Sequence, residues 1–225
     1  MNKKETIQIA IDGPGGSGKS TLAKLVSARL GFIYVDTGAI YRAIALYCLR
    51  HHLPVDEAQA VIAVLDSIQV NISYVETVQH MFLNGENVSE AIRTMAVSQA
   101  ASMVAAIPQV RDKLLALQQT LAATHHVVMD GRDIGTVVLP QADLKIFLTA
   151  SVLTRAKRRQ AELAAKGEHV DLALLTQEIQ QRDDRDRHRT IAPLVQAADA
   201  ILIDTTEDSI DQVLEKIITL AKPYT

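Results

Sequence analysis

Five short runs of apolar residues recur along the chain, and the segments between them carry helical spacing. The runs cover residues 7–11, 32–35, 126–129, 144–148 and 200–203. The run at 32–35 does not alternate between apolar and polar positions, which is typical of a strand covered on both faces of a sheet. Because strands and helices follow one another in turn, the pattern predicts an α/β fold built on a parallel sheet.

The pattern changes in the second quarter of the chain. Residues 56–67 have helical character, and then apolar and polar positions alternate over residues 69–75 and 80–83. Alternation is typical of strands with one buried face, and Asn84-Gly85 is a strong signal for a tight hairpin turn. We therefore predict a small antiparallel sheet inserted among helices. Short strands need a surface to pack on, so we interpret this sheet as an insert that covers or senses a substrate.

Two helices are predicted after the insert, separated by Pro108, and Ser89 is a candidate N-cap for the first. The most apolar helical stretch, residues 95–107, is interrupted by polar side chains, so no membrane span is expected. A final helix is predicted over residues 209–221. No long exposed apolar stripe is evident on any predicted helix, which favours a monomer.

Composition narrows the class of protein. The chain has 225 residues, of which 48% are apolar and 22% charged, as in a soluble domain with insertions. The net charge of −3 provides no basic field for nucleic acid, so none is expected as a partner. A lone cysteine, Cys48, suits a reducing cytosol and a small buried apolar role. The seven histidines show no metal-ligand spacing.

The first apolar run leads into a glycine-rich loop and then a helix. Gly13, Gly18, Lys19 and Ser20 satisfy the P-loop pattern G-x-x-x-x-G-K-[ST]. Glycines let the backbone turn tightly around an anion, and successive N–H groups at the helix N-terminus bind phosphate. The lysine reaches the β- and γ-phosphates, and the serine hydroxyl is a ligand for Mg²⁺. This segment predicts an ATP site.

A carboxylate after a predicted strand and two arginine-rich segments are further candidates for binding Mg²⁺ or phosphate. Asp130 ends the third apolar run, where a carboxylate in a P-loop protein can hold Mg²⁺ directly or through water. The segments 155–159 and 182–189 are rich in arginine. Such segments are either solvated helices laced with ion pairs or a mobile lid that neutralises a transferring phosphoryl group. The composition of these segments leaves both interpretations open.

Taken together, the motifs resemble those of the bacterial cytidylate kinases, a family of nucleoside monophosphate kinases. The resemblance rests on five segments in this order: Gly13-Pro-Gly-Gly-Ser-Gly-Lys-Ser-Thr21, Asp36-Thr-Gly-Ala-Ile-Tyr-Arg42, Asp130-Gly-Arg-Asp-Ile-Gly135, Arg182-Asp-Asp-Arg-Asp-Arg-His-Arg189 and Ile191-Ala-Pro-Leu194. It extends over nearly the whole chain, and the combination is more specific than the P-loop alone.

The resemblance implies a fold, a reaction and a division into domains. It implies a five-stranded parallel core at residues 1–36, 122–154 and 190–225, a CMP-binding domain at residues 37–121 with its β insert at about 68–90, and a lid at residues 155–189. It also implies a cytoplasmic enzyme that uses Mg²⁺ and transfers the γ-phosphoryl group of ATP to CMP or dCMP.

The resemblance also assigns roles to individual residues. ATP is expected to contact the P-loop residues Gly13, Pro14, Gly15, Gly16, Ser17, Gly18, Lys19, Ser20 and Thr21. Arg155 and Arg159, one helical turn apart, are expected to face ATP. The residues expected to bind CMP are Thr37, Tyr41, Arg42, Ser102, Arg111, Arg132, Asp133, Arg182, Asp186 and Arg189. Lys19, Arg132, Arg182 and Arg189 are the expected catalytic residues.

Cytosine has an amine donor and two acceptors. Among the residues expected to bind CMP, Asp133 therefore suits the amine, while Arg111 and Ser102 suit the acceptors. Thr37, Tyr41 and Arg42 are expected at the CMP phosphate with Arg132 and Arg189. Arg182 and Asp186 match positions that reach the ribose, and whether Arg182 contacts ribose or transferring phosphate stays open.

Two alternative functions remain compatible with a P-loop. One is another small-molecule kinase, acting on a different nucleoside monophosphate, shikimate or dephospho-coenzyme A. The other is a nucleotide-dependent switch without enzymatic function. The guanine-reading motif Asn-Lys-x-Asp of switch GTPases does not occur in the sequence.

Overall fold

The computed structural model describes residues 5–75, 78–165 and 167–225. Residues 1–4 of the predicted core, 76–77 of the predicted insert and 166 of the predicted lid lie outside the described residues.

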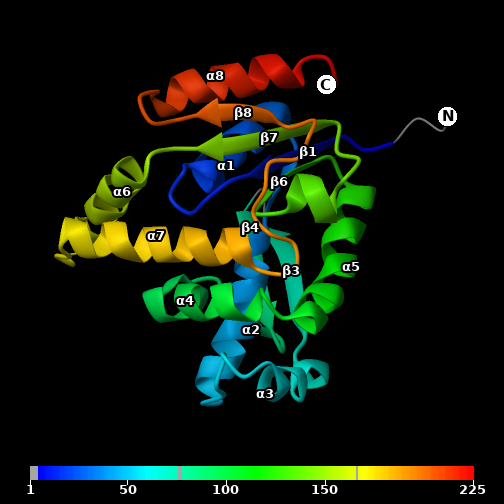
Figure 1. The fold of residues 1–225 in the computed structure, drawn as a ribbon. Coiled ribbons are helices and arrows are strands. Elements are labelled where there is room, and N and C mark those ends of the chain that lie inside the picture. Colours follow the sequence, from blue (N-terminus) through cyan, green and yellow to red (C-terminus); the bar gives the residue numbers. More distant parts are fainter. Residues whose placement is uncertain (1–4, 76–77, 166) are drawn as a thin grey trace.

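A parallel sheet forms the centre of the described structure (Figure 1). Its five strands lie in the order β2 (Ile33–Asp36), β6 (Val127–Gly131), β1 (Gln8–Asp12), β7 (Leu144–Thr149) and β8 (Ile201–Asp204). All neighbouring strands in this sheet pair in parallel. The predicted α/β fold with a five-stranded parallel sheet is therefore confirmed, and its strands match the five apolar runs.

Helices cover both faces of this sheet, which explains why its strands are apolar at consecutive positions. Ile9 and Ile11 pack with α1 (Lys19–Leu30) and α8 (Ile210–Ala221) on one face. Ala10 between them points to the opposite face, where it packs with residues of β6, α5 (Pro108–Thr124) and a π-helical turn at Ile134–Val138. Successive side chains of a strand alternate between faces, so both sets must be apolar.

The predicted insert is a three-stranded antiparallel sheet of β3 (Val70–Val75), β4 (Val78–Leu83) and β5 (Glu86–Asn87). Asn84 and Gly85 join β4 to β5 with positive φ angles of 49° and 85°, as the predicted hairpin turn requires. Met81 and Leu83 of the insert pack in one hydrophobic cluster with α2 (Thr37–Arg50) and α4 (Met95–Val104). Cys48 is fully buried in this cluster, as expected for a small apolar side chain.

Two side chains of the insert attach it to the edge of the central sheet. The backbone N–H of Asp36, at the end of edge strand β2, donates to the Gln79 side-chain oxygen at 2.8 Å. The Tyr74 hydroxyl donates to the Tyr34 carbonyl at 3.0 Å. The insert therefore lies beside the junction between β2 and α2, where Thr37 begins the helix.

Two local predictions need correction. The helical pattern at residues 56–67 forms α3 (Ala58–Ile62) and a separate 3-10 turn at Leu65–Ser67. The N-cap of α4 is Thr94, whose hydroxyl accepts from the Val97 N–H, and it is not Ser89. The Ser89 hydroxyl instead donates to Asn87 and accepts from the Met81 N–H, so it holds the end of the insert.

The two arginine-rich segments lie on α6 (Val152–Ala164) and α7 (Leu172–His188), which pack against each other. Helix α7 passes between the central sheet and α4 (Figure 1). Through Leu175 and Ile179 it shares a small hydrophobic cluster with Met95 of α4. None of the helices in the described part of the chain combines the length and apolar character needed to cross a bilayer.

Candidate active site

The P-loop connects β1 to α1 in a conformation that requires glycine. Gly13 has a φ of 147°, and a Cβ atom there would lie 1.9 Å from the Leu148 carbonyl oxygen of β7. Gly18 adopts a φ of 90° and caps α1 without a side chain. The first N–H groups of α1 are therefore left for an anion. Lys19 is buried, and its ammonium donates to the Pro14 carbonyl at 2.8 Å, across the loop.

The oxygens expected at Mg²⁺ lie together beneath this loop. The Ser20 hydroxyl donates to Asp130 Oδ2 at 2.8 Å, and the Tyr34 hydroxyl donates to Asp130 Oδ1 at 2.9 Å. Burial, and then the nearby Asp36, raise the pKa of Asp130. Mg²⁺ prefers oxygen ligands and commonly combines one or two protein oxygens with nucleotide phosphates. The Ser20 hydroxyl and the Asp130 carboxylate fit such an ion. Within the described residues, no group of three or more His, Cys, Asp or Glu side chains is placed to hold a metal.

Three cationic side chains converge on the P-loop. A methyl group on Gly15 would lie 3.5 Å from Arg132 Nη2 and 3.7 Å from Arg182 Nη1. Burial, followed by repulsion from Arg132, lowers the pKa of Lys19 to about 7. The same two causes lower the pKa of Arg182 to about 10. The buried Nε of Arg182 has no hydrogen-bond partner among the described residues. Arg132 is paired with Asp186 at 2.9 Å, so Lys19 and Arg182 are the members of this cluster best placed to compensate a bound anion.

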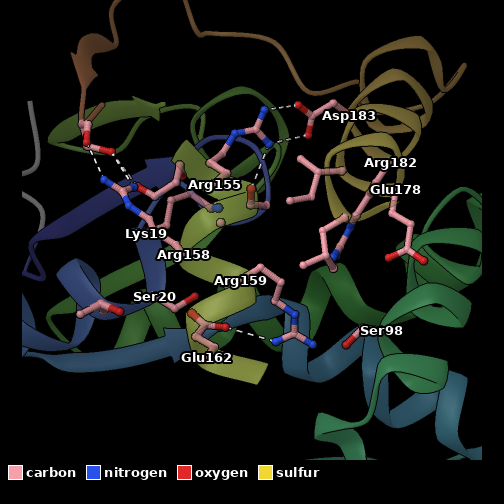
Figure 2. Close-up of a pocket in the computed structure, with 18 of the residues that line it drawn as sticks. Lys19, Ser20, Ser98, Arg155, Arg158, Arg159, Glu162, Glu178, Arg182 and Asp183 are labelled. Atoms are coloured by element: carbon pink, nitrogen blue, oxygen red, sulfur yellow. Dashed lines mark hydrogen bonds and ion pairs between the residues drawn. The ribbon is translucent and has the colours of Figure 1, made fainter. Parts of the chain in front are cut away.

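A cavity of about 750 Å³ extends from the P-loop between the arginine-rich helices (Figure 2). Lys19, Ser20, Arg159 and Arg182 are among the residues that line it. Two lining residues that the sequence did not single out are Arg158 and Thr205. Arg158 donates to the Thr205 hydroxyl at 3.1 Å and to its carbonyl at 2.6 Å. The Thr205 hydroxyl in turn lies 3.1 Å from the Ser17 carbonyl of the P-loop.

Arg155 lines the cavity together with Arg159, but its guanidinium points to a buried partner. Its side chain is 1% exposed, and its guanidinium pairs with Asp183 of α7. It also donates to the Ala150 and Gly15 carbonyls, both at 3.0 Å. Arg159 is partly exposed and pairs with Glu162 at 3.2 Å on its own helix. Both arginines line the cavity at the P-loop. The guanidinium of Arg155 is directed to the buried Asp183 carboxylate on α7, so the expectation that both arginines face ATP stays a prediction.

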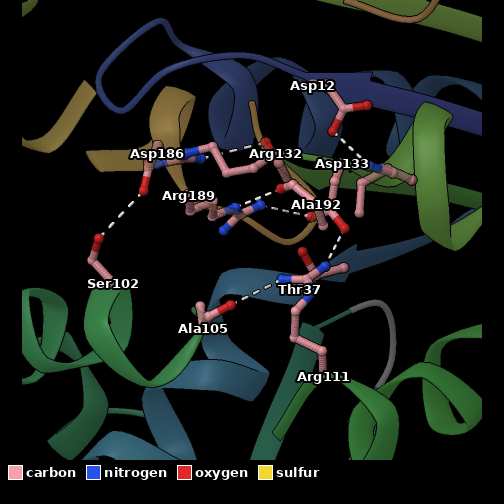
Figure 3. Close-up of polar contacts among 12 residues, drawn as sticks. Asp12, Thr37, Ser102, Ala105, Arg111, Arg132, Asp133, Asp186, Arg189 and Ala192 are labelled. Atoms are coloured by element: carbon pink, nitrogen blue, oxygen red, sulfur yellow. Dashed lines mark hydrogen bonds and ion pairs between the residues drawn. The ribbon is translucent and has the colours of Figure 1, made fainter. Parts of the chain in front are cut away.

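A second group of residues meets on the other side of Arg132 (Figure 3). Arg111 of α5 forms a buried ion pair with Asp133, which also accepts from Arg189 Nη2 at 3.3 Å. Burial raises the pKa of Asp133 in spite of these two arginines. The Arg111 guanidinium lies 5.5 Å from the ring centre of Tyr41, which is buried in the cluster around α2. An arginine and a carboxylate side by side present donors and an acceptor to one edge of a ligand.

Ser102 and Asp186 form a separate contact across α4 and α7. The Ser102 hydroxyl donates to Asp186 Oδ1 at 3.3 Å, while Arg132 Nε donates to Oδ2 at 2.9 Å. Burial opposes ionisation of Asp186, but Arg132 and Arg182 outweigh burial and lower its pKa. Ser102 therefore contacts Asp186, whereas Arg111 pairs with Asp133, and the shared role predicted for Ser102 and Arg111 stays a prediction (Figure 3).

Thr37 and Arg42, expected at the CMP phosphate, are both engaged within the protein. The buried Thr37 hydroxyl donates to the Asp130 carbonyl at 2.8 Å. Arg42 donates to Asp36 at 2.8 Å, and Asp36 also caps α2 by accepting from the Ala39 N–H. The buried Nε of Arg42 lacks a partner within the described residues. Arg42 therefore keeps a free donor, whereas Thr37 uses its hydroxyl hydrogen internally.

Asp12, at the end of β1, was not singled out from the sequence. Its carboxylate accepts from the Ile134 N–H at 2.8 Å and from the Gly135 N–H at 2.7 Å. Burial raises its pKa to about 6. These bonds join the start of the P-loop to the turn directly after Asp133. Its position before Gly13 was visible in the sequence, but its partners are about 120 residues away.

Comparison with known proteins agrees with this geometry. The family profile described as "Cytidylate kinase" matches residues 9–223. A cytidylate kinase of Streptococcus pneumoniae (strain 70585) is 51% identical over 214 residues, covering 95% of this chain and 96% of that protein. A cytidylate kinase of Caldicellulosiruptor saccharolyticus is also 51% identical, with 95% of each chain covered.

Among solved structures, an uncharacterized protein from Eubacterium ventriosum is similar with a TM-score of 0.53 at 14% identity. The match covers 96% of this chain and 99% of that one, and at this identity it supports the fold alone. The family assignment rests on the profile and on the relatives that are 51% identical. This chain belongs to the cytidylate kinase family.

Proposed function

We propose that this protein transfers the γ-phosphoryl group of ATP to CMP or dCMP, giving ADP and CDP or dCDP. The observation that carries the proposal is the convergence of Lys19, Arg132 and Arg182 on the P-loop, with the buried Arg182 Nε unpartnered among the described residues. Such a cluster is costly without an anion and stabilises charge on a transferring phosphoryl group.

The proposed transfer is direct and in line, without a covalent enzyme intermediate. The P-loop N–H groups and Lys19 hold the ATP phosphates, while Arg132 and Arg182 lie beside Gly15 of the loop and Arg132 also pairs with Asp186. Ser20 and Asp130 would hold Mg²⁺, which would neutralise phosphate charge. Closure of the lid would exclude water, which otherwise hydrolyses ATP. A phosphate monoester is largely ionised near neutral pH, so a strong general base is unnecessary.

For the acceptor, we propose that Asp133 accepts from the cytosine amine while Arg111 donates to the ring acceptors. The ion pair between them supports this assignment, because it places donor and acceptor next to each other. Uracil has a carbonyl where cytosine has the amine, and this carbonyl would face the carboxylate. Arg42 and Arg189 are proposed for the CMP phosphate, and Asp186 with Ser102 for the remaining contacts of CMP.

We retain the division into core, CMP-binding domain and lid as part of this proposal. The hydrophobic cluster around α2 supports it, since its residues all lie within 39–117, while the smaller cluster of α6 and α7 also contacts Met95 of α4. A cytoplasmic, monomeric enzyme remains our expectation.

The test is ADP production from ATP and Mg²⁺ with a panel of acceptors: CMP, dCMP, UMP, AMP, GMP and none. We expect strong turnover with CMP and dCMP and little with the others. Preference for UMP or AMP would overturn the roles of Asp133 and Arg111. Turnover independent of any acceptor would favour the nucleotide switch, and turnover with shikimate or dephospho-coenzyme A would favour the other kinases.

A further inference from the structure

One guanidinium connects three parts of the molecule in the interior of the protein. Arg155 of α6 forms a two-point ion pair with Asp183 of α7, with N–O distances of 3.0 and 2.6 Å. Both side chains are 1% exposed. Arg155 also donates to the Gly15 carbonyl of the P-loop at 3.0 Å. The two lid helices and the ATP-binding loop therefore meet at this pair.

The pair restricts where α7 can lie. Two parallel hydrogen bonds between a guanidinium and a carboxylate fix orientation as well as distance. Removing either partner of a buried ion pair leaves an uncompensated charge, so the pair resists separation. Arg182 is the neighbour of Asp183, and Asp186 lies one helical turn further along α7. Holding Asp183 therefore also sets the position of Arg182 near Gly15 and of Asp186 near Arg132.

We propose that Arg155 and Asp183 are positioning residues that hold the lid on the P-loop, so that Arg182 and Asp186 reach the substrates. This inference rests on the proposed function for what those two residues do. Although Arg155 is among the residues that line the cavity, its role in this arrangement is to position the lid and not to bind ATP. Four of its five N–H groups are used within the protein, and its charge is compensated by Asp183. Figure 2 shows its guanidinium turned towards Asp183.

The sequence provides a matched pair of variants for the test. Asp183→Asn removes the buried charge with little change of shape. Asp184→Asn makes the same change at the next residue, which is exposed and whose carboxylate accepts from Gln180 on its own helix. We expect Asp183→Asn to lower kcat/KM for CMP at least 10-fold, and Asp184→Asn to change it less than twofold.

The affinity for ATP separates positioning from direct binding. Measured without CMP, the Kd for ATP should stay within threefold in Asp183→Asn, because the P-loop N–H groups, Lys19 and the contact of Arg155 with Gly15 remain. The ratio of acceptor-free ATP hydrolysis to phosphoryl transfer should rise, since a displaced lid admits water. Arg155→Lys should lower kcat/KM for CMP similarly, and the double variant should lose no more than the larger single loss.

The opposite results would overturn the proposal. One such result is a 10-fold weaker affinity for ATP in Arg155→Lys together with unchanged CMP turnover in Asp183→Asn. That combination would make Arg155 an ATP ligand. If the single variants fail to fold, the apolar pair Arg155→Met with Asp183→Leu provides the test, because such replacements of buried ion pairs often preserve stability. Full CMP turnover in that folded variant would contradict a positioning role.

Hydrogen exchange tests the positioning role without measuring turnover, so its result does not depend on the proposed reaction. Hydrogen exchange of the α7 amides with a non-hydrolysable ATP analogue bound should become faster in Asp183→Asn and not in Asp184→Asn. Unchanged exchange in Asp183→Asn would contradict the positioning role whichever substrate the enzyme uses. Failure of the wild-type protein to use CMP would instead contradict the proposed function alone.

Discussion

Arginines of the two arginine-rich segments lie in different electrostatic surroundings, which their neighbours determine. Arg155 faces a buried carboxylate and is electrically compensated. Arg182 lies beside Arg132 instead, and its pKa falls because of burial and this like charge. Residue type identifies both as candidates for phosphate binding. Only the position of the surrounding charges distinguishes an arginine that lies against a buried carboxylate from one that lies beside another cation.

At Asp133 we predict a change of acceptor preference. Asp133→Asn replaces an acceptor by an amide that can also donate, so the cytosine amine loses a charged partner while the uracil carbonyl gains a donor. Hydrogen bonds to charged groups contribute about 1.5–3 kcal/mol, so kcat/KM for CMP should fall roughly 10- to 150-fold. Steady-state kinetics with CMP and UMP measure the effect. Asp112→Asn, an exposed change beside Arg111, is the control, and an unaltered CMP-to-UMP ratio in Asp133→Asn would contradict the assignment.

At Asp12 we predict a pH-dependent contribution to stability. Folding raises the pKa of Asp12 from 3.8 to about 6, because burial penalises its charge. The stability associated with its protonation is therefore fully present below pH 3.8 and is lost as the pH rises through about 6. The Asp12→Asn variant cannot titrate at this position. Relative to it, the free energy of unfolding of the wild-type protein should fall by up to about 3 kcal/mol between pH 4 and pH 7. Urea unfolding of both proteins across this range measures the difference, and a constant difference would show that Asp12 does not titrate as described.

At the scale of single elements, capping and edge contacts determine how the region around α2 and α4 is built. Helix α4 begins at the Thr94 cap and carries both Ser102 and Met95 to α7. The insert is attached to Asp36 through Gln79 at the edge strand of the central sheet. An edge strand has unpaired backbone groups, and the side-chain amide of Gln79 accepts from the Asp36 N–H and donates to the Asp36 carbonyl. The insert therefore lies against the junction that begins α2.

The cap of α4 can be tested by stability. Thr94→Ala removes the acceptor for the Val97 N–H, so the free energy of unfolding should fall by about 1 kcal/mol. Thr120→Ala on the exposed face of α5 should change it by less than about 0.5 kcal/mol. Denaturant unfolding provides both values. Equal stability of Thr94→Ala and the wild-type protein would argue against this cap.

At the scale of the whole molecule, an overall acidic protein encloses a local concentration of positive charge. The net charge is −3, yet Lys19, Arg132 and Arg182 meet at one loop with lowered pKa values for Lys19 and Arg182. Electrostatic repulsion among these cations destabilises the ligand-free protein, and a bound anion reduces this repulsion. Function and stability are therefore opposed at this point, as is common in active sites.

Millimolar sulfate should consequently raise the melting temperature more than chloride at equal ionic strength. A ligand at 10 times its Kd stabilises by about 1.4 kcal/mol, which corresponds to roughly 3–6 °C for a protein of this size. Arg182→Met should remove most of this response and leave the ligand-free protein as stable as the wild type or more so, because a buried charge with an unpaired donor is lost. Thermal unfolding in both salts measures this. An undiminished sulfate response in Arg182→Met would place the anion site elsewhere.

The sequence by itself determined the strands, the P-loop, the antiparallel insert and the family, because these depend on local patterns of apolar spacing, glycine and turn residues. Its motifs also pointed to Lys19 and Asp133 as site residues, and the family resemblance pointed to Arg111. Only the tertiary structure decided that Arg155 turns towards Asp183, that Ser102 meets Asp186, and that Asp12 supports the turn after Asp133. Those contacts join residues 28, 84 and 122 positions apart. Long-range pairing of charges depends on how elements pack in three dimensions, and no local periodicity encodes it.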